Sequence, residues 1–255
     1  MITNEDIEST YRLGLNRNEV AARLGISARR VRAVLKGKFR TRKEYQFFIN
    51  KKKAHPLDAK KLQCILGTLL GDGSFFINRG IPVLSISHCG QQKEYLEHKR
   101  KIIGAPPLMS CYKDQKSYSS GSIFYRMSYN NRWCLDQIAN IVLVNNRKIV
   151  NKKWVELLEI EGIAYWFMDD GFSSFAKSNY PKVNAGFSTQ SFSDREVRLL
   201  RRRLTDFGIQ TTKTKRPKGF NINISRHSVN NFMKQIEPFL VDCMYYKLKY
   251  SVYAS

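Results

Sequence analysis

The chain has 255 residues, of which 44 are lysine or arginine and 21 are aspartate or glutamate, so its formal net charge is +23 at pH 7. This excess predicts a polyanionic partner, foremost nucleic acid. No apolar run reaches the roughly 18 residues of a membrane span, and no long basic amphipathic helix offers a wide apolar face, so we expect no membrane association.

The first residues, MITNEDIEST, are polar and acidic, unlike a signal or transit peptide. The five cysteines are spread out without a CxxC pair, and we expect them to be buried, reduced thiols. We therefore expect a cytoplasmic or nucleoid-associated protein of a bacterium or phage, or a protein of an organelle matrix, and not a secreted one.

Residues 4–36 predict three short helices in a small all-α module, with domain limits of 1–45. Asn18 is expected to cap the second helix, Gly25 to end it, and Ser27 to cap the third. Two helices joined by a glycine-containing turn are the layout of a helix-turn-helix DNA-binding module, although a helical hairpin with a solvated basic face has the same pattern. Four basic residues at the third helix are expected to contact DNA: Arg29, Arg30, Arg32 and Lys36.

Residues 46–60 are predicted to form a basic linker with interleaved aromatic residues. We expect it to lie along DNA, and a flexible, solvated linker is the alternative.

From about residue 60 the chain repeats itself. The segments CILGTLLGDGSF (64–75) and GIAYWFMDDGF (162–172) both bring an apolar helix to an Asp-Gly pair, so Asp72 matches Asp170. Alternating strands and a polar-capped helix follow in each copy. The predicted fold class is α+β, with helices on one face of each sheet and unit limits of 61–155 and 156–255.

The other face of each predicted sheet is polar. In GFNINISRH, residues 220, 222 and 224 are apolar and the residues between them are polar. Polar and basic strand residues can read base edges in a major groove, whereas the alternative is the solvated face of an antiparallel sheet. The strand residues predicted to contact DNA are Arg126, Lys213, Lys215, Asn221, Asn223 and Ser225.

Small residues predict that the two apolar helices pair closely along a helix seam. Gly67 and Gly71 lie four residues apart on one face of the first helix, and Ala164 lies near the same level of the second. Asp72 and Asp170 would then meet at the end of the seam, where two carboxylates repel each other unless a cation lies between them. Mg²⁺ prefers such oxygen ligands, and the arrangement is typical of metal-assisted phosphodiester hydrolysis.

The segments LGTLLGDGSF and AYWFMDDGF resemble the paired motifs of the LAGLIDADG homing endonucleases, most closely the single-chain, yeast mitochondrial intron-encoded type. The resemblance covers about 62–250 and includes the blocks VNNRK (144–148), STQSF (188–192) and MYYKL (244–248) in the same order. Two features depart from the usual family pattern. Leu70 and Met168 stand where an acid usually precedes the metal-binding aspartate, and the helix-turn-helix module is an addition.

The resemblance implies two pseudo-symmetric αββαββα units that form a β-saddle on DNA. It implies a monomer that cuts both strands of a long site, leaves short 3′ overhangs and promotes the mobility of its intron or gene. Mg²⁺ or Mn²⁺ would be the cofactor, and Ca²⁺ can bind without supporting cleavage. The implied catalytic residues are Asp72, Asp170, Lys148, Lys247 and Gln190, and the implied metal contacts are Asp72, Asp170, Gly71 and Asp169.

Two alternatives to the nuclease stay open. An RNA maturase would use the same fold to hold intron RNA and assist splicing. A catalytically silent regulator would use it to bind DNA only. Both metal-binding aspartates are present, which favours the enzyme over either alternative.

Overall fold

The computed structural model describes residues 2–12, 16–36, 57–112, 123–175 and 183–250. The chain divides into two compact units, Met1–Ala54 and His55–Ser255, each with a hydrophobic core of its own. Most of the predicted linker lies outside the described residues, and its final residues belong to the start of a helix. Within the described ranges, no helix is long and apolar enough to cross a membrane.

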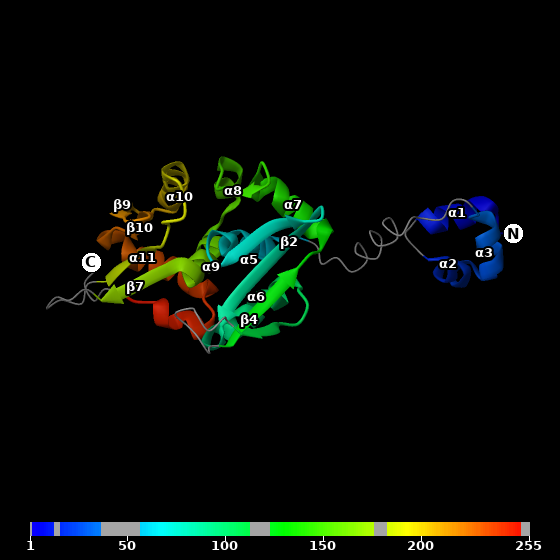
Figure 1. The fold of residues 1–255 in the computed structure, drawn as a ribbon, viewed down its shortest axis with the longest axis horizontal. Helices are drawn as coiled ribbons and strands as arrows, with labels where there is room; N and C mark the ends of the chain where they lie inside the picture. Colours follow the sequence, from blue (N-terminus) through cyan, green and yellow to red (C-terminus); the bar gives the residue numbers. More distant parts are fainter. Residues whose placement is uncertain (1, 13–15, 37–56, 113–122, 176–182, 251–255) are drawn as a thin grey trace. The chain divides into compact units, whose positions relative to one another are not determined.

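The first unit contains three short helices around a small apolar core. They are α1 (Asn4–Arg12), α2 (Arg17–Leu24) and α3 (Ala28–Val34) (Figure 1). The core side chains come from all three helices and from the residue that ends α3: Ile7, Tyr11, Val20, Ala21, Val31 and Leu35.

The caps of these helices agree with the sequence expectation in two cases out of three. Asn16, and not Asn18, caps α2, because its side chain accepts the backbone N–H groups of Asn18 and Glu19 and Glu19 completes a capping box. Gly25 ends α2 with a φ of 61°, a left-handed conformation that favours glycine. Ser27 caps α3 by accepting the backbone N–H of Arg30.

The second unit holds two copies of one pattern, and the first copy follows the predicted order αββαββα. Its strands form an antiparallel sheet in the order β1-β2-β4-β3. A short hairpin and a further helix then lead to the second copy. The elements are α5 (Ala59–Leu70), β1 (Gly73–Asn78), β2 (Ile81–Cys89), α6 (Lys93–Ile103), β3 (Met109–Tyr112), β4 (Ile123–Tyr129), α7 (Arg132–Val142), β5 (Leu143–Val144), β6 (Arg147–Lys148) and α8 (Lys152–Leu157).

The second copy repeats the order αββαββα, which confirms the predicted fold. Its sheet has the order β7-β8-β10-β9, the same arrangement as in the first copy. In both copies the helices that follow the strands pack against one face of the sheet. The elements are α9 (Ile160–Asp170), β7 (Gly171–Phe175), β8 (Val183–Phe187), α10 (Asp194–Asp206), β9 (Thr211–Arg216), β10 (Gly219–Ile224) and α11 (Arg226–Ile236), followed by the 3₁₀ turns η2 (Glu237–Phe239) and η3 (Asp242–Lys247).

Helices α5 and α9 lie side by side at the centre of this unit (Figure 1). A Cβ atom on Gly67 would lie only 2.0 Å from the carbonyl oxygen of Gly162 and 2.8 Å from Cβ of Tyr165. One on Gly162 would lie 2.6 Å from Oε1 of Gln63. The two backbones therefore touch along the helix seam. Ala164 is fully buried, but the atoms nearest to Gly67 belong to Gly162 and Tyr165.

Candidate active site and DNA-binding surfaces

Two carboxylates lie at the ends of the paired helices. Asp72 follows α5 after Gly71, and Asp170 is the last residue of α9. Each is followed by a strand that begins at a glycine, so the chain turns sharply at both places. An acid at a helix C-terminus is opposed by the helix dipole. Positive charge near the two carboxylates is therefore needed to offset the negative end of each helix dipole.

Two lysines supply positive charge at these helix ends. The ammonium of Lys148 donates to the carbonyl oxygens of Leu69 and Gly73, at 2.8 and 2.9 Å. The ammonium of Lys247 donates to the carbonyl oxygens of three consecutive residues of α9, of which Met168 is the closest at 2.6 Å. Both lysines thus satisfy carbonyls that a helix leaves unpaired at its C-terminus, and Lys148 also binds the first carbonyl of β1. Burial lowers the pKa of each lysine.

The environment of the two acids opposes their ionisation. Burial and the neighbouring Asp169 raise the pKa of Asp72 to about 6. Burial, followed by repulsion from Asp72 and Asp169, raises the pKa of Asp170 to about 7. Asp72 nevertheless keeps a side-chain exposure of 40%. Two half-buried acids that repel each other and remain accessible to solvent favour a bound cation.

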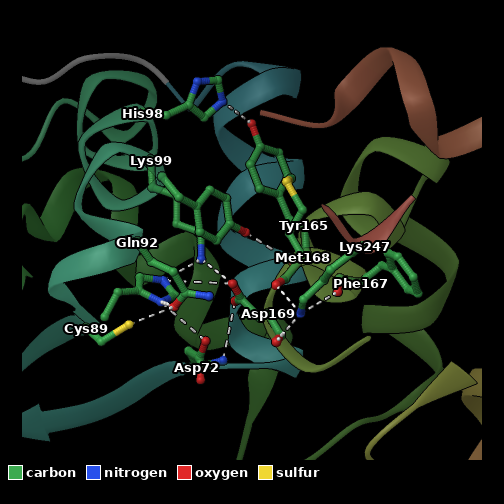
Figure 2. Close-up of polar contacts among 12 residues, drawn as sticks. Asp72, Cys89, Gln92, His98, Lys99, Tyr165, Phe167, Met168, Asp169 and Lys247 are labelled. Atoms are coloured by element: carbon green, nitrogen blue, oxygen red, sulfur yellow. Dashed lines mark hydrogen bonds and ion pairs between the residues drawn. The ribbon is translucent and has the colours of Figure 1, made fainter. Parts of the chain in front are cut away.

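Asp169 occupies the seam itself rather than the solvent side. Its side chain has no solvent exposure, and its Oδ2 accepts the backbone N–H of Asp72 at 3.3 Å (Figure 2). It stands where the first copy has Gly71, and a Cβ atom on Gly71 would lie 2.3 Å from Cβ of Asp169. A glycine at position 71 therefore makes room for Asp169.

A buried lysine and a buried histidine complete the surroundings of Asp72. Lys99 of α6 donates to Oδ1 of Asp169 at 2.6 Å (Figure 2). Its ammonium also contacts Nε2 of His88 at 3.2 Å. The other ring nitrogen of His88, Nδ1, lies 3.2 Å from Oε1 of Gln92 and 3.5 Å from Oδ2 of Asp72. Lys99 also lies over the ring of Tyr95, at 4.1 Å from its centroid. Burial, followed by the charge of Lys99, lowers the pKa of His88 to about 4, so the ring is neutral at pH 7.

Within the described ranges, Asp72, His88 and Asp169 offer ligand atoms within 4.8 Å of one another. The ammonium of Lys99, however, already contacts both Asp169 and His88. A divalent cation between those two would meet a positive charge at contact distance. The acids fit a divalent cation better on the side where Asp72 and Asp170 face solvent. On that side Lys148 and Lys247 contact backbone carbonyls and leave the carboxylates of Asp72 and Asp170 accessible.

Gln190 lies in the exposed turn that follows β8. Two residues earlier, the backbone N–H of Ser188 donates to the carbonyl oxygen of Asp170 at 3.0 Å, which ties this turn to the end of α9. A Cβ atom on Gly219 would lie 2.4 Å from the carbonyl oxygen of Gln190. The backbone of Gln190 is therefore packed against the sheet while the residue faces solvent.

The strand register corrects the prediction for two lysines of β9. Lys213 pairs with Ile222, and Lys215 with Phe220. Residues that pair directly across antiparallel strands point to the same face, and Ile222 is fully buried under the helices. Lys213 forms an ion pair with Asp194 at the start of α10 and covers the ring of Phe220. Both lysines thus lie on the helix side of the sheet, not on the predicted DNA face.

The opposite face of β9 and β10 carries different residues. Thr212, Thr214 and Arg216 share this face with Asn221 and Asn223. Asn223 donates to the hydroxyl of Thr214 at 2.5 Å. Asn221 is only 6% exposed, so it offers little surface for the predicted DNA contact. Its Oδ1 has no hydrogen-bond donor among the described residues.

A polar hollow of about 650 Å³ opens on this face of the second sheet. Hydroxyl, amide and guanidinium groups from four strands and from the start of α11 line it, and such groups can pair with base edges. They include Ser174, Asn184, Thr212, Arg216, Asn223 and Ser225.

The first sheet has a comparable polar face. Arg126 of β4 pairs with Ser87 of β2 and donates to its hydroxyl at 3.2 Å. Ser85 and Ser128 form the next pair that faces the same way. Arg126 therefore lies on the side away from the helices, where the sequence predicted a DNA contact.

The four basic residues that the sequence predicted to contact DNA from the helix-turn-helix module are exposed: Arg29, Arg30, Arg32 and Lys36. Arg29 and Arg32 are on α3, whereas Lys36 lies just beyond its end. Arg30 donates to the carbonyl oxygen of Ile2 at 2.6 Å and so also fastens the start of the chain to α3.

Sequence reasoning missed His88, Lys99 and Gly162. His88 had a signal, because in PVLSISH it alternates with Leu84 and Ile86 and therefore belongs to the buried face of β2. Lys99 also had a signal, because it follows Tyr95 and Leu96 by one helical turn and precedes Ile103 by another, which places it on the apolar face of α6, whereas the exposed Lys101 follows Glu97 and His98.

Comparison with known proteins agrees with this geometry. The model of the LAGLIDADG DNA endonuclease family matches residues 62–232, which is more than half of the chain. The DNA endonuclease I-ChuI of Chlamydomonas applanata is 28% identical over 75% of this chain and 95% of its own length. The cytochrome b mRNA maturase bI2 of Debaryomyces hansenii is 26% identical over 76% of this chain and 75% of its own length.

Among solved structures, the homing endonuclease I-WcaI bound to its DNA recognition sequence has a TM-score of 0.70 with this chain. It is 22% identical, and the match covers 80% of this chain and 92% of that one, which supports a common fold. Paired helices that bring two aspartates together between two like sheets, together with the match of the family model, show that this chain belongs to the LAGLIDADG DNA endonuclease family.

Proposed function

We propose that this chain cuts both strands of a long, specific double-stranded DNA site with the help of a divalent cation, Mg²⁺ or Mn²⁺. The cut would leave short 3′ overhangs and promote the mobility of its intron or gene. One observation carries the proposal. Two mutually repelling carboxylates, Asp72 and Asp170, meet at the junction of two like halves and remain accessible.

The aspartates and lysines have separate roles in this proposal. Asp72 and Asp170 would hold the cation, which supplies water activation and charge stabilisation at the leaving oxygen. Lys148 and Lys247 fix the helix ends by donating to backbone carbonyls of α5 and α9. The positive charges of the two lysines partly offset the rise in the pKa of Asp170. Two half-buried acids kept at fixed positions would hold the positive charge of the cation where negative charge develops during phosphodiester cleavage.

The symmetry of the unit suits a duplex. The two strands of DNA are related by twofold axes perpendicular to the helix, and the two copies of the αββαββα pattern place one acid each at their junction. One chain with two copies can then act as a monomer. The polar faces of the two sheets would read the base pairs on either side of the cut.

The helix-turn-helix module would add affinity outside this core. A second DNA-binding module on the same chain raises the effective concentration of the first, and the exposed Arg29 and Arg32 suit phosphate contacts. We propose the cytoplasm, the nucleoid or an organelle matrix as the compartment, since the target is DNA and the thiols of Cys64, Cys89, Cys134 and Cys243 are free.

A second candidate function is supported by the relative from Debaryomyces hansenii, which is named an mRNA maturase. A chain with a net charge of +23 could hold intron RNA on the same polar sheets. A maturase or a silent regulator would not need two acids at the seam, and both are present here.

A cleavage screen tests the proposal. Purified protein is incubated with a randomised DNA library and Mg²⁺, with a parallel sample in EDTA. Double-strand breaks at one long site that need the metal support the nuclease. Absence of cleavage together with tight binding to intron RNA would favour the maturase instead.

A further inference from the structure

The two aspartates of the site rest on different supports, although the two copies share one fold. Asp72 has its backbone N–H bound by Asp169 and its carboxylate beside Nδ1 of His88. Both of these groups contact the ammonium of Lys99. We name Lys99, Asp169 and His88 the Lys99 network.

The positions around Asp170 that match the Lys99 network carry no charged groups. The glycine that follows each aspartate pairs with Ile86 in the first copy and with Phe187 in the second, so these two residues are equivalent. Two residues after Ile86 comes His88, and two residues after Phe187 comes Thr189. The hydroxyl of Thr189 donates to the carbonyl oxygen of Phe220.

The remaining two positions differ in the same way. Lys99 lies eleven residues after His88, and the residue eleven places after Thr189 is Leu200. Leu200 is a buried core residue of α10. Gly71, which matches Asp169, has no side chain. Asp170 therefore lacks a counterpart of the Lys99 network.

The chemistry of Lys99 determines how the Lys99 network is oriented. An ammonium group only donates hydrogen bonds, so Nε2 of the neutral His88 ring must accept, and its proton must lie on Nδ1. That N–H then points to Gln92 and Asp72. The same ammonium holds Oδ1 of Asp169, leaving Oδ2 for the backbone N–H of Asp72.

The Lys99 network is costly to keep for stability alone. Lys99 and Asp169 both have fully buried side chains, and apolar residues often replace such pairs without loss of stability. The matching positions around Asp170 hold Leu200 and Gly71 instead. A role in orienting Asp72 explains why the charges are kept on its side of the site.

We propose that Lys99, Asp169 and His88 are positioning residues for Asp72 and that Asp170 has no such support, so that the two DNA strands are cut by unequally supported halves of the site. This inference rests on the proposed function. It predicts that damage to the Lys99 network changes the balance between the two strand cuts, whereas general damage to the fold would slow both cuts together.

The test measures the nicking rate of each strand on duplexes labelled at either end. The variants are Lys99→Met and the charge-free pair Lys99→Met/Asp169→Asn, which leaves no unpaired buried charge. The matched control is Leu200→Met in the second copy. We expect the ratio of the two strand rates to change by about tenfold or more in both network variants, because a misplacement of about 1 Å can cost roughly 100-fold.

The control should leave the ratio within about twofold of the wild-type value, as a conservative core exchange does little to a rigid site. Equal slowing of both strands in the network variants, or no slowing of either, would overturn the proposal.

A second readout does not depend on cleavage. In the metal-free wild-type protein, ¹⁵N-labelled histidine spectra at pH 7 should show His88 as the neutral Nδ1–H tautomer, assigned by its loss in His88→Phe. The pair Lys99→Met/Asp169→Asn should lose this preference. An Nε2–H tautomer in the wild type would overturn the proposal. If the wild type does not cut DNA at all, the proposed function fails, while these spectra still decide whether Lys99 orients His88.

Discussion

Gly67 is the position where the pairing of α5 and α9 can be tested with a single methyl group. In Gly67→Ala, the new Cβ atom would lie 2.0 Å from the carbonyl oxygen of Gly162 and 2.8 Å from Cβ of Tyr165. The first contact is with backbone, so no side-chain rotation relieves it. The helices must separate, and the acids at their ends must move with them.

Two effects of opposite sign decide the magnitude. Alanine stabilises a helix interior by about 1 kcal/mol relative to glycine. Overpacking costs about 1–3 kcal/mol and occasionally more, and a clash with backbone belongs at or above the upper end. We therefore expect a net loss of about 2 kcal/mol, which lowers the Tm of a unit of this size by roughly 4–8 °C.

The assay is thermal unfolding followed by circular dichroism, together with the rate of DNA cleavage. The matched control is Gly90→Ala, where the nearest atom to a new Cβ is a carbonyl oxygen at 3.4 Å. We expect the control to stay within about 2 °C of the wild type. A Gly67→Ala protein as stable as the wild type, with full activity, would refute close backbone packing along the helix seam.

Three further predictions follow from the charges. Arg216→Ala should weaken DNA binding and reduce the slope of log K against log [salt] by about 1, whereas Lys213→Ala should leave that slope unchanged, because Lys213 lies on the helix side. Arg29→Ala in the helix-turn-helix module should also reduce the slope by about 1, and an unchanged slope would place that residue away from phosphate. The pKa values of Asp72 and Asp170 are raised to about 6 and about 7, so the folded protein binds protons more tightly than the unfolded chain and loses stability as the pH rises through that range. In metal-free buffer the Tm of Asp72→Asn/Asp170→Asn should therefore exceed that of the wild type by more at pH 8 than at pH 4, and a constant difference would contradict the raised values.

Local patterns in the sequence were enough to predict the two copies of the fold and the position of its acids. The Asp-Gly pairs end apolar helices, and strand alternation predicted the buried faces of β2 and β10. Alternation alone could not say which face of β9 meets the helices, because TTKTKR is polar on both faces. That choice depends on the pairing of Lys213 with Ile222 in β10, which is a tertiary contact.

The partner of Lys99 was beyond local reasoning for a related reason. Helical spacing from Tyr95 and Leu96 places Lys99 on the apolar face of α6, but it does not say that Lys99 meets Asp169. That meeting depends on α6 packing beside α5 and α9. The residue that makes room for Asp169, Gly71, was identified in the sequence as a small residue of the helix seam, but its partner was not.

Asp72 and Asp170 are proposed to act together in cutting DNA and not to be needed for holding it. The direct measurement compares Asp72→Asn/Asp170→Asn with Asp136→Asn, an exposed acid on α7, for both binding and cleavage of the target site in Mg²⁺. We expect the double variant to bind the site as tightly as the wild type, or more tightly, and to make no cut, while Asp136→Asn cuts normally. Normal cleavage by the double variant would show that these two aspartates do not act in catalysis.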